Sequence, residues 1–198
     1  MKNQNQAWEK IYKRKEQLNQ FPFTEVVSFC KNKWPNNSAL DLYALDVGCG
    51  SGVHSYFLAE MGFKVTAFDE SKYAINAAKK MFDHQKINYS ISSFDNLDVS
   101  DKKFDFVLDR LSTTHSSQNI TKDFYSNLRS KLNKDAKIFW EGFCWDDSAR
   151  SFGKKEGDGS WNNFNSGELK DLGSVAFFTL ADVKKTFKKY KLVNINKI

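Results

Sequence analysis

From Tyr43 onward, short apolar runs alternate with amphipathic segments, and this alternation constrains the fold more than any other feature of the chain. Five runs have the composition of strands, at residues 43–47, 64–68, 87–91, 104–108 and 137–140. Between them, apolar side chains recur at every third or fourth position, which is typical of helices. Strands separated by helices form a parallel sheet, because each crossover must return over one of its faces. The sequence therefore predicts a doubly wound, mostly parallel α/β sheet with helices on both faces.

The segments before and after these alternating strands and helices have different sequence patterns. Residues 1–38 carry two helical patterns and are predicted to form an N-terminal helical cover. Residues 144–174 interrupt the alternation of strands and helices, because they are rich in Gly, Ser, Asn and Asp with aromatic residues between them. We interpret this segment as a substrate-side insertion rather than as disorder. A further helix at 180–187 and a sixth strand at 192–195 follow. We expect residues 1–198 to fold as a single domain.

Composition excludes several classes of protein. A chain with 40% hydrophobic residues and 18 Phe is not disordered. No apolar run approaches the ~20 residues that span a bilayer, and the first ten residues lack a secretory pattern, so we expect a cytoplasmic protein that binds no membrane. Three cysteines and three histidines lack ligand spacing, which predicts no metal and no disulfide. The net charge of +6 is spread along the chain, so DNA is not expected and RNA is not favoured as a partner.

A glycine-rich turn follows the first predicted strand, within the segment Leu45-Asp-Val-Gly-Cys-Gly-Ser-Gly52. Gly48, Gly50 and Gly52 allow the backbone to approach a ligand at the carboxyl edge of the sheet. The spacing G-x-G-x-G differs from the dinucleotide fingerprint, because Val53 stands where that motif needs its third glycine. No Gly-Lys-Ser/Thr follows, which excludes a Walker A loop. The turn predicts a nucleotide-like ligand.

Acidic residues follow the next two strands. Asp69 ends the second strand about 20 residues after Gly48, where a carboxylate accepts hydrogen bonds from ribose hydroxyls. Asp95 follows the third strand and offers an acceptor to an adenine amino group, with a solvated loop aspartate as the alternative. Together with the glycine turn, these positions predict a nucleoside site.

These motifs, with Phe104-Asp-Phe-Val-Leu-Asp109, resemble those of class I S-adenosylmethionine-dependent methyltransferases over about residues 40–145. The resemblance implies a Rossmann-like methyltransferase fold and S-adenosylmethionine as cofactor. It implies that the glycine turn contacts the methionine part of the cofactor and that Asp46 orders the turn and the cofactor's amino group. By the same correspondence Asp69 would hold the ribose and Asp95 the adenine.

The resemblance also implies further cofactor contacts around the ring, the transfer point and the cover. These are Glu70 and Phe94 flanking the adenine, Asp109 and Arg110 between cofactor and substrate, and Trp8 and Tyr12 on the covering helix.

The sequence departs from the family pattern at the end of the sheet and after the fourth strand. The family commonly ends in an antiparallel pair of strands, whereas this sequence stops at Ile198, directly after the predicted sixth strand. The last strand is therefore missing, and either the chain is truncated or another element completes the sheet edge, for example a partner chain in a homo-oligomer. The fourth strand also lacks the Asp/Asn-Pro-Pro-aromatic motif of enzymes that methylate nucleic-acid bases or glutamine.

The predicted function is methyl transfer from S-adenosylmethionine to an O or N atom of a small-molecule acceptor. His115, six residues beyond Asp109, is the candidate general base, with loop packing as the alternative. The alternative functions are a noncatalytic cofactor-binding or scaffold subunit and an RNA methyltransferase. We also predict that the helix around Trp8 and Tyr12 and the segment around Trp145 and Trp161 close over the cofactor and form the acceptor pocket.

Overall fold

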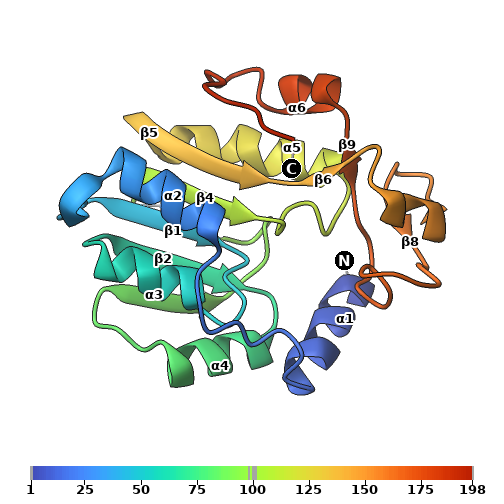
Figure 1. Cartoon of the computed structure of the whole chain (residues 1–198), viewed down its shortest axis with the longest axis horizontal. Coiled ribbons are helices and arrows are strands. Elements are labelled where there is room, and N and C mark those ends of the chain that lie inside the picture. The colour runs from blue at the N-terminus through green and yellow to red at the C-terminus, as the bar shows by residue number, and fades with distance from the viewer. Residues whose placement is uncertain (1, 98, 100–101, 198) are drawn as a thin grey trace. The chain divides into compact units, whose positions relative to one another are not determined.

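The structure is a computed structural model that describes residues 2–97, 99 and 102–197 (Figure 1). Its longer helices and the strands of its central sheet are α1 (Lys2–Lys13), α2 (Thr24–Lys33), β1 (Tyr43–Val47), α3 (Val53–Glu60), β2 (Lys64–Asp69), α4 (Lys72–Met81), β3 (Ile87–Ile91), β4 (Phe104–Arg110), α5 (Gln118–Leu128) and β5 (Leu132–Glu141). After β5 come β6 (Phe143–Cys144), η3 (Ser148–Phe152), β7 (Lys154–Lys155), β8 (Trp161–Asn162), β9 (Phe177–Phe178) and α6 (Leu180–Thr186), while η1 (Pro35–Asn37) and η2 (Arg129–Lys131) are single turns.

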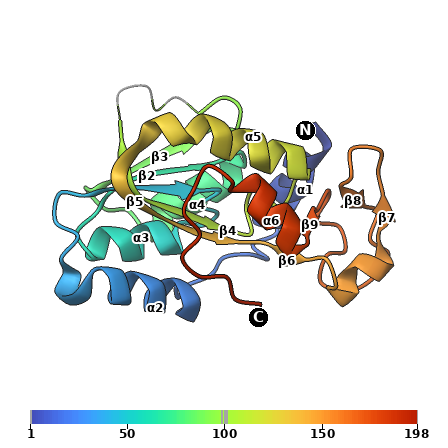
Figure 2. The same cartoon turned by 90° about the horizontal axis from the view of Figure 1, so that it is seen from above.

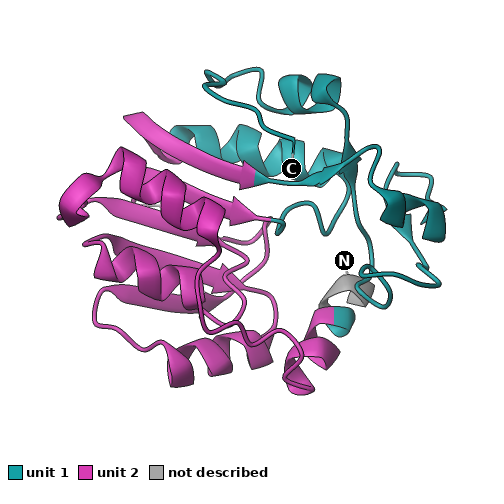
Figure 3. Cartoon of the chain, in the orientation of Figure 1, with its two compact units in different colours: residues 1–7, 111–130, 141–198 teal, residues 8–110, 131–140 magenta. Residues whose placement is uncertain are grey.

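The chain divides into two compact units, coloured separately in Figure 3. Residues 8–110 and 131–140 form one unit, which we call the sheet unit. Residues 1–7, 111–130 and 141–198 form the other, which we call the second unit.

The sheet unit is built on five strands in the order β3-β2-β1-β4-β5 (Figure 1). β1 pairs in parallel with both β2 and β4, so that Leu45 lies opposite Thr66 on one side and Val107 on the other. β2 and β3 are also parallel. The predicted doubly wound, Rossmann-like sheet is therefore confirmed. The strand order reverses at β1, which is where open α/β sheets bind ligands at the carboxyl ends of their strands.

One face of this sheet carries α2 and α3 (Figure 2). Phe29 of α2 stacks on Phe106 of β4 with ring centres 5.7 Å apart, and Trp34 meets Phe63 edge-on at 5.0 Å. Leu58 of α3 is fully buried in the same apolar cluster. Burial of each such side chain contributes about 1.5–3 kcal/mol, so this layer holds β1 and the turn after it in a fixed place.

The predicted sixth strand at 192–195 is wrong, because residues 191–197 form no strand. Leu192, Val193 and Ile195 are 39%, 76% and 45% exposed. Before them, the Tyr190 hydroxyl donates a hydrogen bond to the Tyr125 carbonyl at 2.6 Å. The β-branched composition predicted a strand, but a strand also needs a partner edge, and composition does not supply one.

The segment predicted as an insertion has a small core of its own within the second unit. β6 and β9 pair in parallel, with Phe143 opposite Phe177, and β7 and β8 pair antiparallel. Phe164, Leu169 and Val175 are buried with Phe177 in one apolar cluster. Buried aromatics explain why a stretch rich in polar and small residues is structured here.

The described part of the chain has neither a membrane-spanning helix nor a cluster of metal-ligating side chains. None of its helices has both the length and the apolar character that crossing a membrane requires. Within the same residues, no three or more His, Cys, Asp or Glu side chains gather in a way that could hold a metal ion. Cys30, Cys49 and Cys144 are free thiols.

Candidate cofactor site

The glycine turn joins β1 to α3 in a conformation that favours glycine. Gly48, Gly50 and Gly52 have φ angles of 61°, 53° and 89°, in the left-handed region. A Cβ on Gly52 would lie 2.6 Å from the Tyr89 hydroxyl and 2.8 Å from the Ala78 Cβ. A Cβ on Gly50 would collide with the Tyr12 hydroxyl. The three glycines therefore serve both the backbone geometry and the close approach of neighbouring elements.

Asp69 connects this turn to the next one. Its Oδ2 accepts a hydrogen bond from the Gly50 N–H at 3.0 Å, and its Oδ1 accepts one from the Ser71 N–H at 2.9 Å. Burial raises the pKa of Asp69 to about 6, against the lowering effect of these two hydrogen bonds. The carboxylate thus organises two strand-to-helix turns at the carboxyl edge of the sheet.

Asp46 lies beneath the turn on β1. It is buried, and its Oδ2 accepts a hydrogen bond from the Ser55 hydroxyl at 2.6 Å. Burial raises the pKa of Asp46 to about 7, and the charges of Asp69 and Asp109 add to the increase. Ser55 was not predicted as a site residue. It lies three residues beyond Gly52, the last glycine of the motif.

Helix α1 packs on the glycine turn through Tyr12. The Tyr12 hydroxyl contacts Gly50, and burial followed by the charge of Asp69 raises the Tyr12 pKa well above its usual range. Trp8 lies one helical turn earlier, with its ring centre 5.9 Å from that of Tyr12. The structure therefore brings the predicted Tyr12 to the turn, with Trp8 beside it.

Glu9 is a site residue that sequence analysis missed. Its carboxylate accepts hydrogen bonds from the Ser71 hydroxyl at 3.0 Å, the Lys72 N–H at 3.1 Å and the Tyr73 N–H at 3.3 Å. These donors form the first turn of α4, whose free N–H groups favour a negative charge. Glu9 thereby ties α1 to the helix that follows Asp69.

Glu9→Ala is expected to lower the free energy of unfolding by about 1–2 kcal/mol, because the α4 N-terminus loses an anionic cap. Denaturant titration followed by circular dichroism measures the change. Glu16→Ala is the matched control, since Glu16 is exposed and forms only a 3.8 Å pair with Arg14. Equal stability of the two variants would contradict the role assigned to Glu9.

The predicted adenine contacts lie after β2 and β3. Phe94 meets Phe68 edge-on with ring centres 6.1 Å apart, and the Asp95 carboxylate accepts a hydrogen bond from the Ser93 hydroxyl at 2.6 Å. Burial raises the pKa of Glu70, and the charges of Asp69 and Asp95 raise it further. Asp95 itself is exposed.

At the end of β4, Asp109 is fully buried and the Arg110 guanidinium lies 3.4 Å from the Phe23 ring centre. His54 accepts a hydrogen bond from the Phe23 N–H at 3.3 Å through Nε2. Burial, followed by the positive charge of Arg110, lowers the His54 pKa to about 4. His54 is therefore a neutral packing group at neutral pH.

His115 belongs to the second unit, whereas the residues predicted to bind the cofactor belong to the sheet unit. It is buried and meets Phe143 edge-on at 5.5 Å. Burial lowers its pKa to about 4, so the imidazole is neutral at pH 7. Its predicted role as a general base stays a prediction.

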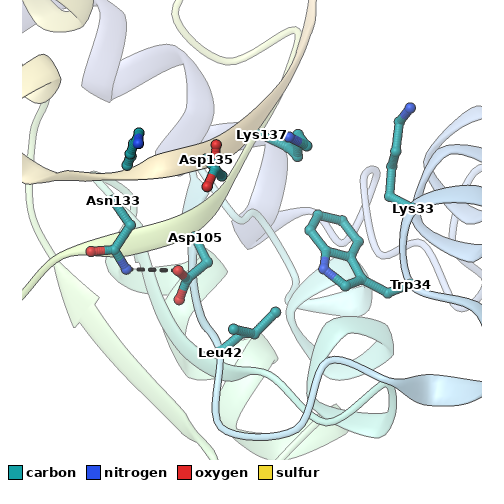
Figure 4. A pocket seen from close by; sticks show the side chains of 8 residues that line it. Lys33, Trp34, Leu42, Asp105, Asn133, Asp135 and Lys137 are labelled. Carbon is teal, nitrogen blue, oxygen red and sulfur yellow. Dashed lines mark hydrogen bonds between the residues drawn. The ribbon is translucent and has the colours of Figure 1, made fainter.

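A pocket of about 370 Å³ lies at the other edge of the sheet unit, at the amino ends of β1, β4 and β5 (Figure 4). The Asp105 carboxylate at its floor accepts hydrogen bonds from the Asn133 amide at 2.6 Å and from the Tyr43 N–H at 2.9 Å. The lining residues are Lys33, Trp34, Leu42, Asp105, Asn133, Lys134, Asp135 and Lys137. Because the glycine turn follows the carboxyl end of β1, this pocket is not part of the candidate cofactor site.

Part of the chain matches a known protein family. The family model for a methyltransferase domain matches residues 44–135, which include the glycine turn and both acidic positions. Over these residues, slightly less than half of the chain, the protein is similar to class I S-adenosylmethionine-dependent methyltransferases. The match supports the resemblance on which the expected cofactor contacts depend.

Curated relatives match the chain over part of their length. A ubiquinone biosynthesis O-methyltransferase of Rickettsia conorii is 41% identical over 75 residues, covering 37% of this chain and 26% of that protein. The corresponding Rickettsia bellii protein is 34% identical over 98 residues, covering 48% of this chain and 40% of that protein. The chain thus spans well under half the length of these relatives.

A solved structure extends the likeness of the fold over nearly the whole chain. It is the 1,6-didemethyltoxoflavin-N1-methyltransferase of Burkholderia thailandensis, with bound 1,6-didemethyltoxoflavin and S-adenosylhomocysteine. It is 15% identical, and the match covers 95% of this chain and 76% of that chain with a TM-score of 0.69. At this identity the likeness shows the fold alone.

Proposed function

We propose that this chain binds S-adenosylmethionine at the glycine turn and transfers its methyl group to an O or N atom of a small molecule. The observation that carries the proposal is the pair of carboxylates at Asp46, which is buried, and Asp69, which is partly buried. Neither forms an ion pair with a described residue, and the pKa values of both are raised by burial. A cation at this position would stabilise both negative charges, and S-adenosylmethionine carries positive sulfonium and ammonium groups.

The residues around these carboxylates fit the rest of the cofactor. Asp46 would hold the ammonium group beside the glycine turn, and Asp69 would accept hydrogen bonds from the ribose hydroxyls. Asp95, with Glu70 and Phe94, would contact the adenine. Tyr12 would cover the cofactor from α1, because its hydroxyl already contacts Gly50.

The sulfonium of the cofactor makes its methyl group electrophilic, so the protein must align an acceptor lone pair and exclude water. For an alcohol acceptor, His115 would take the proton, because its lowered pKa keeps the imidazole neutral and able to accept. The names of the relatives include an O-methyltransferase and those of the solved structures an N-methyltransferase, so we propose both acceptor atoms.

The proposed function is tested by titration calorimetry with S-adenosylmethionine, followed by a screen of phenols, alcohols and amines in which formation of S-adenosylhomocysteine is measured. We expect cofactor binding and turnover with at least one acceptor. His115→Ala is expected to reduce turnover by about 10²-fold or more while cofactor affinity stays the same, since a general base contributes at that scale. Tighter binding of NAD than of S-adenosylmethionine would contradict the cofactor assignment.

A further inference from the structure

A cluster of two tryptophans and one arginine lies in the second unit, outside the candidate cofactor site. We call Trp145, Arg150 and Trp161 the Arg150 cluster. The Arg150 guanidinium carbon is 4.2 Å from the Trp145 ring centre and 5.2 Å from the Trp161 ring centre. The two indole rings are 6.3 Å apart and nearly perpendicular. Lys155 adds a second positive charge, with its Nζ 6.0 Å from the Trp145 ring centre.

Backbone hydrogen bonds at and before β9 fix the main chain of both tryptophans. The backbone N–H of Trp145 donates to the Phe178 carbonyl at 2.9 Å, and the backbone N–H of Trp161 donates to the Val175 carbonyl at 2.8 Å. Arg150 lies on η3, whose first turn is capped by the side chain of Asp147. The cluster is thus anchored on hydrogen-bonded backbone, which is a preorganised arrangement.

Several polar atoms at the cluster lack hydrogen-bond partners. The Arg150 Nε, the Trp161 Nε1 and the Oδ1 of the neighbouring Asn162 are shielded from solvent without a partner. An unmet buried polar group costs about 1–3 kcal/mol, and native proteins leave few of them. Two of the three atoms are N–H donors, so a ligand with acceptor oxygens would satisfy them.

The charges at the cluster favour an anion. Arg150 forms no ion pair with a described residue, although its charge contributes, after the hydrogen bond from Lys197, to the lowered pKa of Asp146. Asp146 pairs with Lys197, and Asp147 accepts the Ala149 N–H at 2.9 Å. Lys155 stands directly opposite Trp161 in the β7–β8 pair. Two cations beside two aromatic faces are suited to a planar anion.

We propose that the Arg150 cluster binds an aromatic carboxylate. The Arg150 guanidinium donates to the carboxylate, while the aromatic ring of the ligand packs on Trp145, which is 37% exposed. Trp161 donates through its indole N–H.

The probes are 4-hydroxybenzoate and anthranilate, each compared with its uncharged amide. Calorimetry on the full chain saturated with S-adenosylhomocysteine is expected to show each carboxylate binding at least about tenfold more tightly than its amide. Arg150→Gln is expected to weaken carboxylate binding by about tenfold or more and to leave amide binding within about twofold.

Arg129→Gln is the matched control, because the Arg129 guanidinium also stacks on an aromatic ring in the second unit, 5.7 Å from the Tyr190 centre. We expect this variant to bind the carboxylates as the wild type does. Equal losses in the two variants, equal affinity for carboxylates and amides, or no binding of either carboxylate would overturn the proposal. Titration with S-adenosylmethionine separates the two inferences, since its failure in the wild type counts against the proposed function instead.

Discussion

Gly52→Ala is expected to destabilise the fold by about 2–4 kcal/mol, through backbone strain and overpacking acting together. At a φ of 89°, the backbone of a residue with a Cβ is strained even where the side chain has enough space. Space is also absent, because the new Cβ would lie 2.6 Å from the Tyr89 hydroxyl and 2.8 Å from the Ala78 Cβ. The free energy of unfolding from denaturant titration measures the effect.

The matched control is Gly157→Ala in the second unit. A Cβ on Gly157 would meet no atom within 4 Å, and its φ is not in the left-handed region. We expect that variant to stay within about 0.5 kcal/mol of the wild type. If Gly52→Ala were equally mild, the close packing of β3 and α4 against the glycine turn would not be the reason for glycine at this position.

Asp69→Ala is expected to weaken binding of S-adenosylmethionine by about 1–3 kcal/mol, or roughly 5- to 150-fold. The variant loses the proposed ribose acceptor and also the acceptor that orders the Gly50 and Ser71 N–H groups. Titration calorimetry measures the loss, and circular dichroism checks that the fold survives. Asp135→Ala is the control, because Asp135 is exposed at the opposite edge of the same unit.

The raised pKa of Asp69 adds a pH test of the same residue. Its carboxyl is protonated below about pH 6 in the free protein, where it is a weaker acceptor for the ribose hydroxyls. Cofactor affinity of the wild type is therefore expected to fall by about tenfold at pH 5 from this group alone. Asp69→Asn should lack that part of the decline. Unchanged affinity in Asp69→Ala, with the fold intact, would remove Asp69 from the cofactor site.

Much of the sheet unit was predictable from the sequence because its signals are local. The four strands from β1 to β4 were placed within two residues of their ends, since apolar runs between turn residues mark strands directly. β5 begins at Leu132 instead of residue 137, because its first half is polar and partly exposed. The cap of α4 is also a local signal, because Ser71 directly precedes the helix and its hydroxyl accepts a hydrogen bond from the Ala74 N–H at 3.1 Å.

The residues of the candidate site also divide into those that local sequence patterns predicted and those that they did not. Asp46, Asp69 and the glycines were predicted because each lies at a strand end whose position the pattern marks. Glu9 was missed, since its partner Ser71 is 62 positions away in the sequence and a lone glutamate on a helix gives no sign of it. The sixth strand was predicted wrongly for a related reason, because local composition does not reveal whether a partner edge exists.

The sequence by itself determined the parallel sheet, the glycine turn and the acidic residues after the strands, because these follow from periodicity and from neighbouring residues along the chain. Only the tertiary structure decided that Tyr12 contacts Gly50, that Glu9 caps α4 and that Arg150 lies against Trp145 and Trp161. Such contacts depend on which side chains meet when distant segments pack, and that outcome is set by burial and shape across the whole fold rather than by any local pattern.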